Sequence, residues 1–87
     1  MNDYNDRFKE SVYKLATNVL ERIIIAFPAY PWFYSFMSSV KMGVGDKSAA
    51  RKFLQQAGLK LKILRFANQD LINEENATIV ELADLLK

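Results

Sequence analysis

The chain of 87 residues contains no cysteine and no histidine. Without cysteine it can form neither a disulfide framework nor a thiolate zinc site. Without histidine it lacks the commonest general base and the commonest transition-metal ligand. An enzyme of this composition would have to work through Asp, Glu, Lys, Tyr or Ser alone. We therefore predict a protein with no catalytic residues, no metal site and no cofactor.

Turn-forming residues and long apolar runs are also scarce. Three glycines and two prolines predict few turns and long elements. No apolar run reaches the length of about 18 residues that a membrane span requires, and the polar N-terminus is unlike a signal peptide. A chain of this size is expected to form one domain, residues 1–87. We expect a cytoplasmic protein without a membrane span.

Apolar residues recur at spacings of three and four along most of the chain, the period of amphipathic helices. We predict helices over 4–27, 31–42, 47–57 and 59–72, and a last helix that follows a polar turn at 73–76 and runs to the end. Pro28 should end the first helix, Pro31 should begin the second, and Asp46 should cap the third. Gly58 should end the third helix. The predicted fold is all-α, a compact bundle of four to five helices with a long N-terminal helix.

The same spacing predicts which residues point into the bundle. The first helix should bury one face, formed by Tyr4, Phe8, Val12, Leu15, Ala16, Val19, Leu20, Ile23, Ile24 and Phe27. Its C-terminal end should be buried on more than one side, because residues 23–27 are apolar all round. In the second helix, the expected inward face is Trp32, Phe33, Phe36, Met37 and Val40, and the expected outward side is Tyr34, Ser38 and Lys41.

One short stretch, residues 27–36, holds six of the eleven aromatic residues and both prolines. Aromatic residues at helical spacing are more often core than recognition surface. We therefore interpret this stretch mainly as the corner where the first helix turns back. Aromatic side chains that remain accessible there could dock into a protein groove or stack on bases. The candidates for a protein interface are Tyr30, Trp32 and Tyr34.

The net charge of +2 conceals an uneven distribution of charge. Residues 1–40 have no net charge, residues 41–65 carry +6 and residues 66–87 carry −4. Basic side chains on two adjacent helices could form the footprint of a phosphate backbone. The candidate nucleic-acid-binding residues are Lys47, Arg51, Lys52, Lys60, Lys62 and Arg65. A basic face that only aids solubility, or that pairs with an acidic helix of a neighbour, explains the same pattern.

In size, helicity and charge pattern, the whole chain resembles the small helical subunits of CRISPR effector complexes. This resemblance is one of architecture, and it implies contacts with a nucleic-acid backbone and with neighbouring subunits, without catalysis. The leading hypothesis is a non-enzymatic module that binds DNA or RNA independently of sequence and contacts a protein partner or a second copy. The alternative is a small protein-binding regulator, of the phage-inhibitor or bacteriocin-immunity type, that docks through an aromatic and apolar surface.

Overall fold

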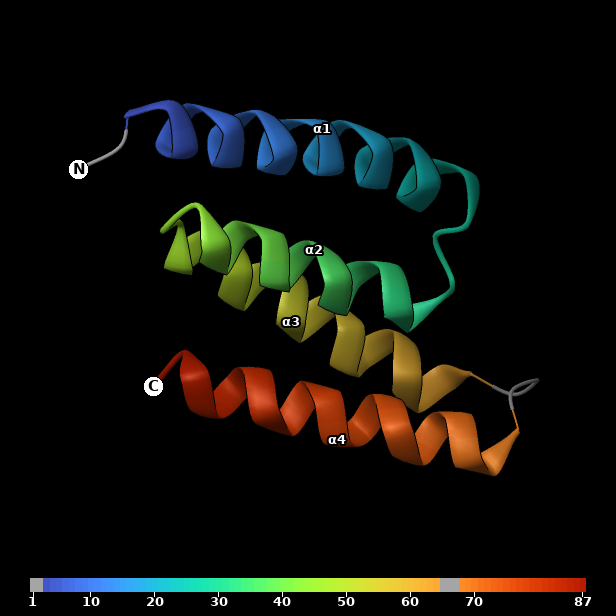
Figure 1. Ribbon diagram of the computed structural model, residues 1–87. Helices are drawn as coiled ribbons and strands as arrows, with labels where there is room; N and C mark the ends of the chain where they lie inside the picture. The colour runs from blue at the N-terminus through green and yellow to red at the C-terminus, as the bar shows by residue number, and fades with distance from the viewer. Residues whose placement is uncertain (1–2, 65–67) are drawn as a thin grey trace.

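The computed structural model describes residues 3–64 and 68–87. They form four helices: α1 (Asp3–Ala26), α2 (Pro31–Gly43), α3 (Lys47–Ile63) and α4 (Gln69–Leu85), as Figure 1 shows. The described residues contain no strand, so the predicted all-α class with a long N-terminal helix is confirmed. None of the described helices combines the length and the apolar character that crossing a bilayer requires.

Local chemistry explains the first two connections. α1 ends at Ala26 and α2 begins at Pro31, where a proline loses no helical hydrogen bond. The Tyr34 hydroxyl of α2 donates a hydrogen bond of 2.9 Å to the Pro28 carbonyl, which links the connection to α2.

In the connection between α2 and α3, Gly45 takes a positive φ of 85°, which glycine adopts without a steric cost. Asp46 then caps α3 by accepting a hydrogen bond from the amide of Ala49 at 3.0 Å.

The predicted helix end at Gly58 and the predicted turn at residues 73–76 are wrong. α3 continues through Gly58 to Ile63, and residues 73–76 lie inside α4. Gly58 costs the helix about 1 kcal/mol relative to alanine, but helical contacts continue beyond it, since Leu61 is half-buried. The break lies instead before Asn68, whose side chain accepts a hydrogen bond from the amide of Asp70 at 2.7 Å.

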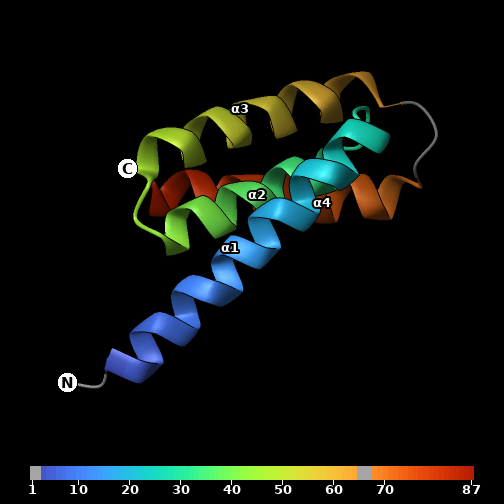
Figure 2. The same ribbon diagram turned by 90° about the horizontal axis from the view of Figure 1, so that it is seen from above.

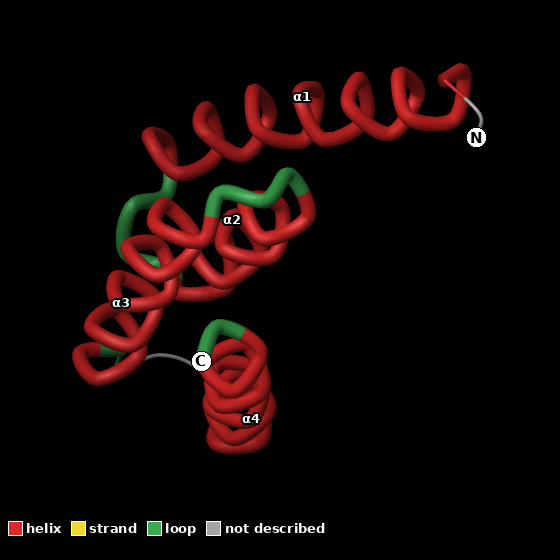
Figure 3. The backbone as a smooth tube through the Cα atoms, turned by 90° about the vertical axis from the view of Figure 1, so that its left-hand side faces the viewer, coloured by secondary structure: helices red, strands yellow, loops and turns green. Residues whose placement is uncertain are grey.

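Helix α2 is the centre of the bundle. Its backbone lies close to those of all three other helices, whereas the backbone of α1 lies close to that of α2 alone among the described helices. In the view of Figure 3, α1 lies above α2, α4 lies below it and α3 lies on one side. No described helix covers the other side of α2, which we call the open side. Figure 2 shows that the N-terminal half of α1 extends beyond the other three helices.

Two clusters of buried apolar residues hold the helices together. One joins α3 to α4 through Ala50, Leu54, Leu82 and Leu86. The other joins α1 to α2 through Leu20, Met37 and Val40. Half-buried residues packed against this second cluster are Tyr13, Ala16, Ile24, Phe33 and Phe53. Phe53 lies on α3, so its side chain reaches the cluster between α1 and α2.

Tyr13 packs against Gly43 at the C-terminal end of α2. A Cβ atom at position 43 would lie 2.6 Å from Cζ of Tyr13, closer than atoms can approach. We expect Gly43→Ala to lower the free energy of unfolding by about 1–3 kcal/mol, the typical cost of overpacking. Urea denaturation followed by circular dichroism measures this change.

Gly58→Ala is the matched control, because it is also a helical glycine and no atom lies within 4 Å of its Cβ position. It should raise stability by about 1 kcal/mol. In a Tyr13→Ala background, the cost of Gly43→Ala should disappear. A Gly43→Ala protein as stable as the wild type would contradict this account of the α1–α2 contact.

Candidate functional site

Helix α1 carries two apolar seams, and only one of them is covered. The inner seam, Tyr13, Ala16, Leu20 and Ile24, packs on the α1–α2 core. The outer seam consists of Phe8, Val12, Leu15 and Val19, whose side chains are 46–65% exposed. Each of the last three outer positions precedes an inner position by one residue. One residue turns a helix by about 100°, so the outer seam faces a different side from the inner one.

The prediction of a single buried face on α1 is therefore wrong. Phe8, Val12, Leu15, Val19 and Phe27 were expected inside and are exposed. The predicted burial on several sides at the end of α1 is also wrong, since Ile25 is 81% exposed. The physical reason is that α1 has one neighbouring helix, which can cover only half of its wide apolar arc. The side chain of Tyr4 lies outside the described residues.

The inward face predicted for α2 is only partly correct. Tyr34 and Ser38 were expected outside but are buried, and Phe36 was expected inside but is 60% exposed. Ser38 is buried because its hydroxyl donates to the carbonyl of Ala50 on α3 at 2.7 Å. Phe36 lies on the α2 face between Ser35, which contacts α4, and Val40, which contacts α1. That face is the open side.

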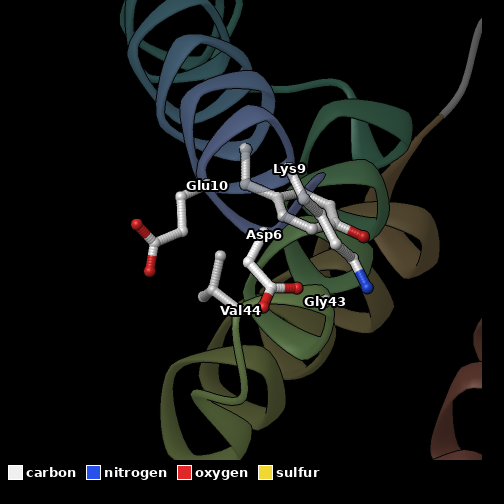
Figure 4. A pocket seen from close by; sticks show the side chains of 6 residues that line it. Asp6, Lys9, Glu10, Gly43 and Val44 are labelled. Atoms are coloured by element: carbon white, nitrogen blue, oxygen red, sulfur yellow. The ribbon is translucent and has the colours of Figure 1, made fainter. Parts of the chain in front are cut away.

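The outer seam of α1 and Phe36 of α2 face the same open side. In Figure 4, Glu10 lies toward Val44, and Lys9 lies toward Gly43. The outer seam continues around α1 from Lys9, away from Glu10, by the helical rotation. Gly43 itself shares one face of α2 with Phe36, seven residues earlier. We call these five exposed residues, Phe8, Val12, Leu15, Val19 and Phe36, the apolar face.

The aromatic corner contributes less accessible surface than predicted. Tyr30 is 42% exposed, Trp32 is half-buried and Tyr34 is only 8% exposed. Tyr30, Trp32 and Phe33 pack with Phe27 in a cluster whose ring centroids lie 6.1–6.4 Å apart. Tyr34 is occupied by its hydrogen bond to Pro28 and by Lys60, whose Nζ lies 5.8 Å from its ring centroid.

The predicted basic residues lie on different sides of α3. Arg51 points toward α4, where its Nη2 donates to the carbonyl of Leu86 at 2.8 Å. Lys60 points toward α2 and Tyr34. Lys52 is exposed and falls opposite the buried residue Ala50 by helical rotation. The structure thus spreads these three side chains around the helix and does not bring them together.

Of the remaining three candidates, only two can be placed, and these two lie far apart on α3. Lys47 and Lys62 are both exposed on α3 and lie about 22 Å apart along its axis. Arg65 lies outside the described residues. The helix predicted over 59–72 is not continuous, because α3 ends at Ile63 and α4 begins at Gln69.

The last two helices differ in the sign of their charge. Helix α3 carries five bases and no acid, whereas α4 carries five acids and no base. They pack against each other, so the acidic helix lies beside the basic one. The acids of α4 weaken the positive field that an incoming phosphate backbone would meet on that flank of α3.

One acid of α4 is buried next to the apolar face. Glu75 is 3% exposed and lines a small cavity with Trp32, Phe36 and Thr78. Its carboxyl oxygen lies 2.8 Å from the hydroxyl of Ser35, which also lies 3.0 Å from the carbonyl of Trp32. Burial raises the pKa of Glu75 above its ordinary value of 4.5, and the hydrogen bond from Ser35 opposes part of this rise.

The geometry at Ser35 fits a protonated Glu75. A serine hydroxyl has one hydrogen to donate, so it cannot serve both the carboxylate and the Trp32 carbonyl. If Glu75 is protonated, it donates to Ser35, and Ser35 donates to Trp32. Both contacts are then satisfied. Sequence reasoning missed this buried acid because Glu75 stood in a predicted polar turn.

A cavity between Asp6, Glu10, Tyr13 and Val44 offers little chemistry. Figure 4 shows its acidic and basic side chains around the end of α2. Among the residues that the structure describes, no group of three or more acids converges as a metal site would require. The predicted absence of metal, cofactor and catalytic residues remains a prediction. Comparisons with protein families, with curated proteins and with solved structures find no significant match to this chain.

The stability of the protein should depend on the protonation of Glu75. Because the folded state raises its pKa above 4.5, the folded protein binds more protons than the unfolded chain between pH 4.5 and the raised pKa. Stability therefore falls as pH rises through this window. Gln at position 75 cannot ionise and can still donate to Ser35.

We expect Glu75→Gln to be more stable than the wild type at pH 7 by about 1–3 kcal/mol, the cost of burying a poorly compensated polar group. The difference should vanish below pH 4. Urea denaturation at both pH values measures it, and Glu74→Gln at an exposed neighbouring position is the control. Equal pH dependence in the wild type and Glu75→Gln would contradict the role of Glu75.

Proposed function

We propose that this protein is a binding module that docks on another polypeptide through its apolar face. The observation that supports the proposal is the outer seam of α1, four large apolar residues at helical spacing with 46–65% of their surface exposed. Exposed apolar patches of several hundred Å² on small proteins mark interaction sites. Phe36 and the half-buried Trp32 extend the patch onto α2.

The spacing of the apolar face suits a helical ligand. α1 and α4 lie on either side of α2, and the open side lies between them (Figure 3). An amphipathic helix that packs its apolar side against the apolar surface of a partner is a common mode of protein recognition. Tyr30 at the corner could contact the end of such a ligand, whereas Tyr34 is buried and can add no contact area.

Site-specific photo-crosslinking in the cells that produce the protein tests this proposal. We expect Phe36→p-benzoylphenylalanine to form a covalent adduct with another polypeptide chain. Lys52→p-benzoylphenylalanine on the outer side of α3 should form none, and Leu15→Glu should abolish the adduct at position 36. Equal adducts at positions 36 and 52, or none at position 36, would refute docking through the apolar face.

A second candidate function is contact with a nucleic-acid backbone through α3. The observation that favours it is the presence of five bases and no acid on this helix, with Lys47, Lys52 and Lys62 exposed. Such contact would be independent of sequence and sensitive to salt, because phosphate neutralisation releases counterions. It remains compatible with the implied role as a small subunit of a nucleoprotein complex.

Salt titration with a short DNA duplex and with single-stranded RNA tests this second candidate. If α3 binds phosphates, Lys52→Glu with Lys62→Glu should weaken binding at least tenfold and reduce the dependence on salt. These two positions are preferable to Arg51, whose substitution would also remove its hydrogen bond to Leu86. Lys9→Glu with Lys14→Glu on α1 is the charge-matched control. Unchanged affinity in the α3 variant would exclude α3 as the contact.

A further inference from the structure

We propose that the occupant of the apolar face is a second copy of this chain, with the two α1 helices paired antiparallel about a two-fold axis. This inference rests on the proposed docking function and names its partner. In a two-fold interface the same patch serves both copies, so it must be complementary to itself. The outer seam of α1 meets this requirement in its spacing, its side-chain sizes and its flanking residues.

The spacing of the outer seam is symmetric. Phe8, Val12, Leu15 and Val19 are separated by four, three and four residues, the pattern of the contact positions in a coiled coil. An antiparallel copy centred between residues 13 and 14 places Phe8 opposite Val19 and Val12 opposite Leu15. Each pair sets a larger side chain against a valine, which lets the two helices interdigitate.

The residues beside the outer seam permit the same arrangement. Ser11 and Asn18 lie along its outer edge and are uncharged, so no like charges meet there. Arg22 continues the seam toward the C-terminal end of α1, and its antiparallel counterpart in the second copy is the uncharged Asn5. Arg22 therefore meets no base of the second copy at this position.

The projecting half of α1 gives this dimer a second contact. Antiparallel pairing lays residues 3–12 of one copy beside residues 15–24 of the other, the part of α1 that packs on α2. Tyr13 lies at the level of Gly43, and the chain reverses between α1 and α2, so Leu20 lies near the level of Phe36. Phe8 of the second copy, opposite Val19, would therefore lie at the level of Phe36 along the bundle.

The size of the open side is sufficient for a stable dimer. The 24 residues of α1 form a helix about 36 Å long. The 13 residues of α2 add a helix about 20 Å long. Helix axes pack 8–10 Å apart, so each helix contributes a strip about 10 Å wide. The resulting area of about 560 Å² on each copy, or about 1,100 Å² in total, exceeds the roughly 1,000 Å² that a biological interface requires.

Sedimentation equilibrium of the purified full-length chain tests the proposal. We expect a species of twice the 10.0 kDa chain mass that dissociates on dilution. Val12→Glu should raise the dissociation constant at least a hundredfold. Val80→Glu is the matched control, because Val80 is similarly exposed at 54% against 47% but lies on α4 away from the apolar face, and it should leave the dimer intact. Circular dichroism establishes that both variants remain folded.

Cysteine crosslinking tests the orientation, since the natural chain has no cysteine. Chains with Phe8→Cys should form disulfides with chains that carry Val19→Cys, and neither should pair with itself. A monomer at 200 µM, or self-pairing of the Phe8→Cys chains, would overturn the proposed dimer. If the purified chain is monomeric but a Leu15-dependent adduct still forms at position 36 in cells, docking through the apolar face stands. Only the second copy as the partner is then overturned. The loss of both results would overturn docking itself.

Discussion

The contact between Ser38 of α2 and Ala50 of α3 is the constraint on which the rest of the bundle depends. Both residues are completely buried, and the Ser38 hydroxyl donates to the Ala50 carbonyl at 2.7 Å. Small residues at this crossing let the two helices approach closely. This pairing fixes α2 in the centre, and it leaves the other sides of α2 for α1 and α4. With α3 occupying one side, the opposite side stays open.

Much of the fold could be predicted from the sequence, because its signals are local. Pro28, Pro31 and Asp46 act through backbone geometry and capping within a few residues, and the structure has them at helix ends as expected. Gly58 and the polar residues at 73–76 gave equally local signals that tertiary contacts override. The burial of Glu75 against Ser35, forty residues earlier, keeps a polar stretch helical. No local pattern reveals such a contact.

The candidate site was harder to predict, for a physical reason. The pattern of α1 reveals a wide apolar arc but not how many neighbours cover it. Only the arrangement in space shows that Phe8 and Leu15 stay exposed while Leu20 is buried. The basic residues illustrate the same limit, because the net charge of residues 41–65 does not show toward which side of the helix each side chain points. Arg51 and Lys60 turn out to contact opposite neighbours of α3.

The contact of Tyr13 with Gly43 also divides α1 into a supported and an unsupported part. About ten residues of α1 precede Tyr13, a length of about 15 Å, and this part extends beyond the other described helices (Figure 2). An isolated helical segment of this length is only marginally stable in water. The helical structure of the arm therefore depends on whatever lies beside it, whereas the buried clusters around α2 do not.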